Sequence, residues 1–110
     1  MVKIDLFYQD DILKRICIYD HANYDVKGHD LVCAGISSIA FGMANSFSEL
    51  CADAVSINID EKNTKIVFEK LVNQEIVDIL FKSLLIQLLT ISNEYSDYIK
   101  IRRFKPWSLF

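Results

Sequence analysis

Apolar residues at every second position open the chain and predict a half-buried strand, formed around Val2, Ile4, Leu6 and Tyr8. A polar turn follows at 9–11, and the stretch from Leu13 to Asp20 then alternates again. The two stretches are close enough in sequence to pair as an antiparallel hairpin. The next ten positions, from Asp20 to His29, have no apolar period and are expected to form an exposed loop.

Spacing of three and four residues replaces the alternation after this loop. The recurring apolar positions are Val32, Ile36, Ile39 or Ala40, Met43, Phe47 and Leu50. This pattern predicts an amphipathic helix from about Leu31 to Cys51. Asp30 precedes it and is the expected N-cap, because a short carboxylate accepts hydrogen bonds from free N–H groups at a helix start.

The second half of the chain repeats the same succession of elements. Alternating residues predict strands at 55–60 and 65–69 around a turn at 61–64, then a long helix at about 73–95 and a short last strand at 98–104. The order β-β-α-β-β-α, with a final β, favours an α+β fold of two layers, in which helices cover a mostly antiparallel sheet. We expect one domain over 1–110, with 105–110 as a flexible tail.

The second predicted helix is apolar over more than one face. Ile76, Leu80, Leu84 and Leu88 form one stripe, and further apolar side chains lie outside it: Ile79, Ile86 and Leu89. One stripe is enough to cover a sheet, so the excess predicts contact with a second copy of the chain. We therefore expect a homodimer.

Composition narrows the class of protein. The chain has 110 residues, of which 52% are hydrophobic, and three cysteines without a C-x-x-C pair. It is expected to be folded, free of disulfides and cytoplasmic. Charged residues in the first positions disfavour a secretory signal, and the apolar stretch 76–91 is interrupted by charge, so no membrane partner is expected. The net charge of −3 disfavours general nucleic-acid binding.

Cys33 is the candidate nucleophile. If Asp30 caps the helix, Cys33 falls in the first turn, where free N–H groups and the helix dipole favour a thiolate. The dipole contributes only about 0.3–1 kcal/mol, whereas one pKa unit corresponds to about 1.4 kcal/mol. A neighbouring imidazolium is therefore needed, and both histidines of the chain, His21 and His29, lie shortly before Cys33.

Spacing alone leaves other readings open. A cysteine near a helix start is more often a small buried side chain than a nucleophile. A metal shared by His21, His29 and Cys33 would lack a clear fourth ligand beyond Asp30, so we expect neither a metal nor another cofactor.

The motif around these residues resembles a known family. Asp20-His21-Ala22 is followed, after a loop, by Gly28-His29-Asp30-Leu31-Val32-Cys33-Ala34-Gly35-Ile36-Ser37. This arrangement is similar to the signature of the ribosomal-processing cysteine protease family, in which Gly-His-Ala precedes Gly-x-Asp-x-Val-Cys-Ala-(Ala or Gly)-x-Ser. The similarity extends to about Glu94-Tyr95. One position departs from the pattern, since Asp20 stands where the family usually has Gly.

The resemblance implies the residue roles and the substrate. It implies His21 and Cys33 as the catalytic pair, with Asp30 and Ser37 as supporting residues. It also implies a bacterial endopeptidase that removes the amino-terminal extension of the precursor of large-subunit ribosomal protein number twenty-seven, cutting after an aromatic residue. The loop at Asn23, Tyr24 and Gly28 would then lie beside the cleft.

Two functions of other classes remain as alternatives. The first is a non-catalytic, dimeric, ribosome-associated binding module in which the thiol is incidental, and the second is a thiol-based redox sensor. Peptide cleavage would separate the protease from both. The basic residues at the end of the chain, Lys100, Arg102, Arg103 and Lys105, are expected to be a solvated face of the last strand.

Overall fold

A computed structural model describes residues 1–19 and 29–105, with the backbone alone for residues 29 and 30. The elements along the chain are β1 (Val2–Gln9), β2 (Ile12–Tyr19), α1 (His29–Cys51), a short 3₁₀ helix η1 (Ala52–Ala54), β3 (Val55–Asp60), β4 (Lys65–Lys70), α2 (Glu75–Glu94) and β5 (Ile99–Phe104). The predicted order of elements is thus confirmed, including the final strand.

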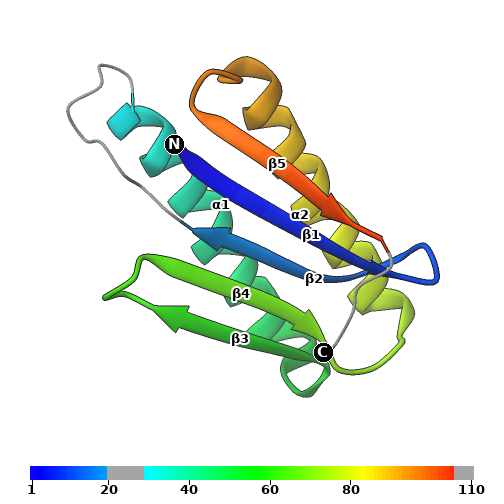
Figure 1. Cartoon of the computed structure of the whole chain (residues 1–110). Helices are drawn as coiled ribbons and strands as arrows, with labels where there is room; N and C mark the ends of the chain where they lie inside the picture. The colour runs from blue at the N-terminus through cyan, green and yellow to red at the C-terminus, as the bar shows by residue number, and fades with distance from the viewer. Residues whose placement is uncertain (20–28, 106–110) are drawn as a thin grey trace.

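The strands form one five-stranded sheet in the order β3-β4-β2-β1-β5, and α1 and α2 lie side by side on one of its faces (Figure 1). All neighbouring strands are antiparallel except β1 and β5, which are parallel. The predicted α+β class, with two layers and a mostly antiparallel sheet, is therefore confirmed.

Local sequence explains both hairpins. Asp10 and Asp11 have φ angles of 53° and 63°, as a two-residue type I′ turn between β1 and β2 requires. In the β3–β4 turn, the Asp60 carboxylate accepts hydrogen bonds from the Asn63 backbone N–H at 3.1 Å and from its side-chain amide at 2.8 Å. Thr64 completes this turn with a φ of 49°. The turn chemistry fixes the register next to each turn, and an irregularity between Phe7 and Tyr8 shifts the register of β1 and β2 by one residue farther along.

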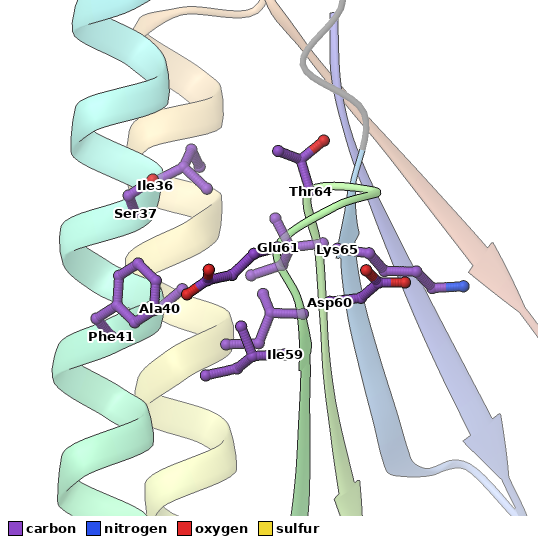
Figure 2. Close-up of a pocket in the computed structure, with 11 residues that line it drawn as sticks. Ile36, Ser37, Ala40, Phe41, Ile59, Asp60, Glu61, Thr64 and Lys65 are labelled. Atoms are coloured by element: carbon purple, nitrogen blue, oxygen red, sulfur yellow. The ribbon is translucent and has the colours of Figure 1, made fainter.

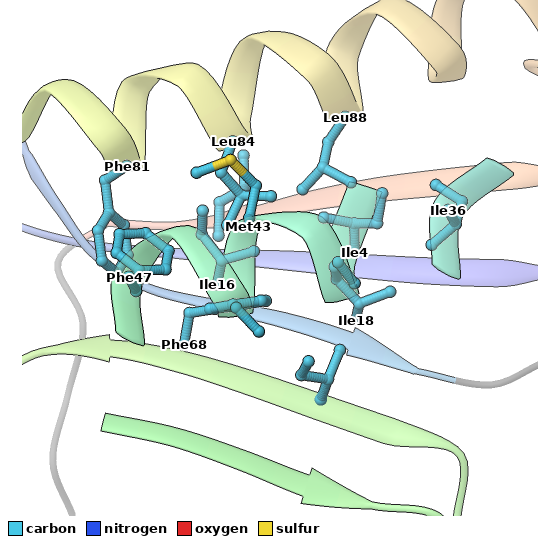
Figure 3. Packing of buried hydrophobic residues seen from close by; sticks show 14 of the residues in the cluster. Ile4, Ile16, Ile18, Ile36, Met43, Phe47, Phe68, Phe81, Leu84 and Leu88 are labelled. Carbon is cyan, nitrogen blue, oxygen red and sulfur yellow. The ribbon is translucent and has the colours of Figure 1, made fainter. Parts of the chain in front are cut away.

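The core lies between the sheet and the two helices. Ile4, Ile18 and Ile66 occupy opposite positions on neighbouring strands and face the helices. Figure 3 shows this packing, in which aromatic rings from α1, β4 and α2 meet at one end: Phe47, Phe68 and Phe81. Burial of these apolar side chains is the main force that holds both helices on the sheet.

The stripe on α2 differs from the prediction. The buried residues are Val77, Phe81, Leu84 and Leu88. Ile76, assigned to the stripe from the sequence, is 41% exposed, because its neighbour Val77 takes the core position. Ile79 and Ile86 are exposed, as their place outside the stripe requires.

Helix α1 is apolar enough to resemble a membrane span. The most apolar 18-residue window within Leu31–Ala54 has a mean hydropathy of 1.4, and 33% of that window is buried in the fold. The sequence expectation of no membrane partner rested on 76–91 and overlooked this stretch. One face of this helix packs in the core and is formed by Val32, Ile36, Ala40, Met43 and Phe47.

The two helices approach closely near Cys33. A Cβ atom added to Gly35 would lie 2.7 Å from the Cδ1 atom of Ile91 on α2. Such a separation is shorter than van der Waals contact, so a larger residue at this position would displace the end of the Ile91 side chain. Gly35 and Ile91 thus mark the place where the two helices face each other, in the turn of α1 that follows the candidate nucleophile.

Candidate active site

Helix α1 begins earlier than the sequence predicts. Its first residue is His29, so Asp30 is the second helical residue rather than the N-cap, and Cys33 is the fifth rather than part of the first turn. The predicted cap is wrong because the helical backbone extends two residues beyond the apolar pattern. A carboxylate in the first turn still complements the positive end of the helix dipole.

Cys33 lies at the edge of the buried face of α1. Val32 and Ile36 on either side of it are buried, whereas Cys33 itself is partly buried and packs against the core. Helical side chains lean toward the N-terminus, so the thiol lies over the preceding turn. That turn contains the N–H groups that have no intrahelical partner. The helix start therefore remains the electropositive neighbour of the thiol.

The three thiols of the chain differ in setting, and none forms a disulfide. Cys17 is buried in β2, and this burial raises its pKa. Burial also raises the pKa of Cys51 at the far end of α1. Both thiols therefore carry less thiolate at neutral pH than a free cysteine would.

The other residues predicted for the site are only partly described. Ser37 is exposed, one turn beyond Cys33 on α1. Several predicted residues lie outside the described part of the chain: Asp20, His21, Asn23, Tyr24 and Gly28. The side chains of His29 and Asp30 also lie outside it. The structure thus places Cys33 and Ser37 and leaves the assignment of the histidine as a prediction.

A polar cluster that the sequence analysis missed lies at the end of β2. The Asp5 carboxylate, only 6% exposed, accepts hydrogen bonds from Arg102 Nε at 2.8 Å and from Arg102 Nη2 at 3.0 Å. It also accepts one from the Tyr19 hydroxyl at 2.8 Å, and Arg102 Nη2 contacts the same hydroxyl. Burial and the hydrogen bond to Asp5 raise the pKa of Tyr19.

This cluster ties together β1, β2 and β5 at the residue where β2 ends. Tyr19 precedes His21 by two positions, so the cluster anchors the strand from which the histidine segment departs. The only sequence signal was the charged Asp5 inside an apolar strand. Its partner Arg102 is 97 residues away along the chain, so local pattern could not identify the pair.

A pocket of about 310 Å³ opens between α1 and the β3–β4 hairpin (Figure 2). Its lining is mostly apolar and comes from α1, β2, β3 and β4: Ile18, Ile36, Ser37, Ala40, Phe41, Ile59, Asp60, Glu61, Thr64, Lys65 and Ile66. The sequence analysis also missed this pocket, because its walls come from segments distant in sequence. Ser37 places its near end one helical turn from Cys33.

The part of the chain that the structure describes contains no group of three or more His, Cys, Asp or Glu side chains able to hold a metal ion. Because both histidine side chains lie outside that part, the metal site weighed from the sequence is not tested by this observation.

A partly buried thiol beside the start of a long helix, in a two-layer α+β fold, is an arrangement that suits a cysteine peptidase. Comparison with known proteins makes the assignment specific. Residues 1–100 match the family model described as cysteine protease Prp, and the chain belongs to this family. The class of enzyme is thus cysteine peptidase, as the motif implied.

Curated relatives match between about three quarters and nine tenths of the chain. The ribosomal processing cysteine protease Prp of Staphylococcus aureus is 29% identical over 103 residues, which cover 92% of this chain and 97% of that protein. The protein of the same name from Bacillus subtilis is 29% identical over 86 residues, covering 74% of this chain and 77% of that protein.

A solved structure matches the fold closely. The S. aureus ribosomal processing protease Prp in complex with a substrate peptide has a TM-score of 0.86 and 25% identity, over 94% of this chain and 100% of that one. The family assigned from the motif is therefore confirmed. The S. aureus protein, whose fold this chain shares, has been solved with a substrate peptide bound.

Proposed function

We propose that this protein is an endopeptidase that removes the amino-terminal extension of large-subunit ribosomal protein number twenty-seven, cutting after an aromatic residue. The observation that carries the proposal is the family match over residues 1–100, within which the motif cysteine, Cys33, lies at the start of α1. The S. aureus relative, named for ribosomal processing and solved with a substrate peptide, supports the peptide as the class of substrate.

In the proposed mechanism, His21 removes the proton from the Cys33 thiol, and the thiolate attacks the scissile carbonyl carbon. Backbone N–H groups of the first turn of α1 stabilise the oxyanion that forms. The tetrahedral intermediate collapses with cleavage of the C–N bond, and His21 returns the proton to the leaving amine. Water then hydrolyses the thioester and regenerates the thiol.

Asp30 and Ser37 take supporting roles in this proposal. Asp30 lies in the first turn of α1, where a negative charge stabilises the helix start. Ser37 follows Cys33 by four residues, the spacing at which two side chains share one helical face. The loop at Asn23, Tyr24 and Gly28 connects β2 to this helix and is proposed to contact the peptide.

We further propose that the enzyme works in the bacterial cytoplasm as a homodimer, without membrane or nucleic-acid partners. Support for the dimer comes from α2, where Ile79 and Ile86 are 59% and 57% exposed. The two residues are seven positions apart and therefore lie on the same side of the helix. A second copy of the chain would remove this apolar surface from water.

The test is incubation with the precursor of ribosomal protein number twenty-seven, followed by mass measurement of the products. We expect one cut after an aromatic residue. Cys33→Ala should abolish it, while Cys51→Ala, a substitution at the other end of the same helix, should retain it. His21→Ala should slow cleavage strongly, and His29→Ala should slow it less.

Binding of the precursor without cleavage would instead favour the non-catalytic binding module. Cleavage by the Cys33→Ala variant would show that the nucleophile is misassigned. A larger loss for His29→Ala than for His21→Ala would exchange the roles of the two histidines.

A further inference from the structure

The residues that follow β5 carry an apolar sequence that neither the family match nor the site uses. Residues 106–110 read Pro-Trp-Ser-Leu-Phe and lie outside the described part of the chain. The family match ends before them, at residue 100. Their position led us to expect a flexible tail. A bound segment fits their composition better, because Trp107, Leu109 and Phe110 are large apolar side chains that gain free energy when they leave water.

Exposed apolar side chains occupy the end of the sheet where β2 begins and β4 ends. Ile12, the first residue of β2, is 46% exposed, and Leu71 and Val72, directly after β4, are 56% and 42% exposed. Lys14 of β2 lines a hollow of about 80 Å³ with Leu71 and Val72, and its ammonium donates a hydrogen bond to the Asn73 side chain at 3.0 Å. The two segments therefore lie side by side. We call Ile12, Leu71 and Val72 the end patch.

The apolar segment starts at the same end of the sheet. β5 ends at Phe104, which pairs with Phe7 near the end of β1, and the chain bends at Lys105 (Figure 1). The Lys105 ammonium lies over the Tyr8 ring, 4.4 Å from its centroid. A cation over an aromatic face is an attractive contact. This contact holds Lys105 against β1, the strand that separates β5 from β2.

The segment is long enough to cross from β5 to the end patch. In the strand order β4-β2-β1-β5, spacings of about 4.8 Å put β4 roughly 14 Å from β5. A chain spans at most about 3.3–3.6 Å per residue, so residue 107 reaches about 7 Å from Lys105 and residue 110 about 17 Å. Pro106 has a fixed φ angle and keeps the residue before it extended, which reduces the conformational entropy that docking costs.

We propose that residues 106–110 dock across this end of the sheet and cover the end patch of their own chain. Trp107 packs against Ile12, and the apolar side chains that follow it pack against Leu71 and Val72. The direct link to β5 makes this contact intramolecular, with an effective concentration on the order of millimolar. A modest apolar contact is therefore sufficient to hold the segment.

The docked segment lies far from the candidate active site. The Leu71 N–H donates a hydrogen bond at 2.8 Å to the carbonyl of Ala54, just beyond the C-terminal end of α1. A rise of 1.5 Å per residue puts Cys51, the last residue of α1, about 27 Å from Cys33 along the helix axis. The segment thus stabilises the fold from the end of the sheet opposite the thiol, and docking does not depend on the proposed substrate.

Trp107 reports docking directly, because it is the only tryptophan of the chain. We expect its emission maximum at a shorter wavelength than that of N-acetyltryptophanamide in the same buffer, and acrylamide quenching that is several-fold weaker. Replacement of two residues of the end patch, Leu71→Ser with Val72→Ser, should move both values toward those of the free compound.

The matched control is Phe41→Ser with Ile59→Ser. These residues are 50% and 45% exposed, close to the values in the end patch, but they line the pocket between α1 and the β3–β4 hairpin. Emission and quenching should be unchanged in this variant. Ile12→Ser, on the other strand of the end patch, repeats the test with one substitution and decides the question if the double patch variant does not fold.

Deletion of residues 106–110 gives an independent readout. It should lower the midpoint of urea unfolding, because a segment that binds only the folded state stabilises that state. The same deletion should leave the midpoint of the end-patch variant unchanged, since the contact is already lost there. Alkylation of Cys33 by iodoacetamide should proceed at the same rate with and without the segment.

Three results would overturn the proposal. The first is emission and quenching equal to those of the free compound in the unmodified protein. The second is a deletion that lowers the midpoint equally in the unmodified protein and in the end-patch variant, because the segment would then bind elsewhere. The third is a shift of the emission to longer wavelength on dilution from micromolar to nanomolar protein, which would show that a second copy holds the segment.

Discussion

Two phenylalanines of α1, six residues apart, should differ strongly in how much each contributes to the stability of the fold. Phe47 is 0% exposed, and its ring centroid lies 5.7 Å from that of Phe68 and 5.2 Å from that of Phe81. Phe41 is 50% exposed and lines the pocket. The same substitution, Phe→Ala, therefore removes a central core side chain at one site and a half-exposed pocket wall at the other.

The expected costs follow from burial. Phe47→Ala removes about 100 Å² of buried apolar surface, worth about 2.5 kcal/mol, and the cavity left behind brings the expected loss of unfolding free energy to about 3–5 kcal/mol. Phe41→Ala leaves no enclosed cavity and should cost about 1 kcal/mol or less. The milder Phe47→Leu should lower the unfolding free energy by about 1 kcal/mol relative to the unmodified protein. Its effect can therefore be measured even if Phe47→Ala fails to fold.

Urea unfolding followed by far-UV circular dichroism measures these differences. With an m-value of about 1.5 kcal/mol/M, Phe47→Ala should lower the midpoint by roughly 2–3 M urea, and Phe41→Ala by less than about 0.7 M. Equal costs at the two positions, or a cost below about 1 kcal/mol for Phe47→Ala, would refute the assignment of Phe47 to the centre of the core.

Three further predictions concern the thiols, the oligomer and metals. At neutral pH iodoacetamide should label Cys33 before Cys17 and Cys51, whose pKa values are raised by burial, as judged by mass spectrometry of peptides; earlier labelling of Cys17 would contradict the assigned nucleophile. Light scattering at micromolar protein should give the mass of a dimer, and Ile79→Ser with Ile86→Ser should shift it toward the monomer; a monomer mass at all concentrations would exclude the dimer. Treatment with EDTA should leave cleavage unchanged, whereas stoichiometric zinc, with activity lost on its removal, would exclude the mechanism as drawn.

Periodicity was sufficient to predict the secondary structure because burial imposes it directly. The first hairpin alternates with period two, and the stretch from Val32 to Phe47 repeats with helical spacing, so each could be assigned without knowledge of its neighbours. The start of α1 was wrong by two residues, because apolar spacing does not report the polar turn that precedes it.

The family and the nucleophile were also assigned from sequence, since Gly28 to Ser37 is a contiguous motif. Ile76 was misplaced because several apolar stripes fit α2 equally well, and only packing against the sheet selects the one that contains Val77.

Contacts between distant segments were decided by the tertiary structure alone. Arg102 reaches Asp5 only because β5 lies parallel to β1, a pairing that no local pattern encodes. The pocket beside α1 exists because the β3–β4 hairpin lies at the edge of the sheet, across β2 from β1. Local sequence determines which residues share a face of an element, whereas the sheet order determines which faces meet. The chain by itself thus predicted the reactive thiol and its helix, and the fold supplied the pocket that lies between this helix and the β3–β4 hairpin.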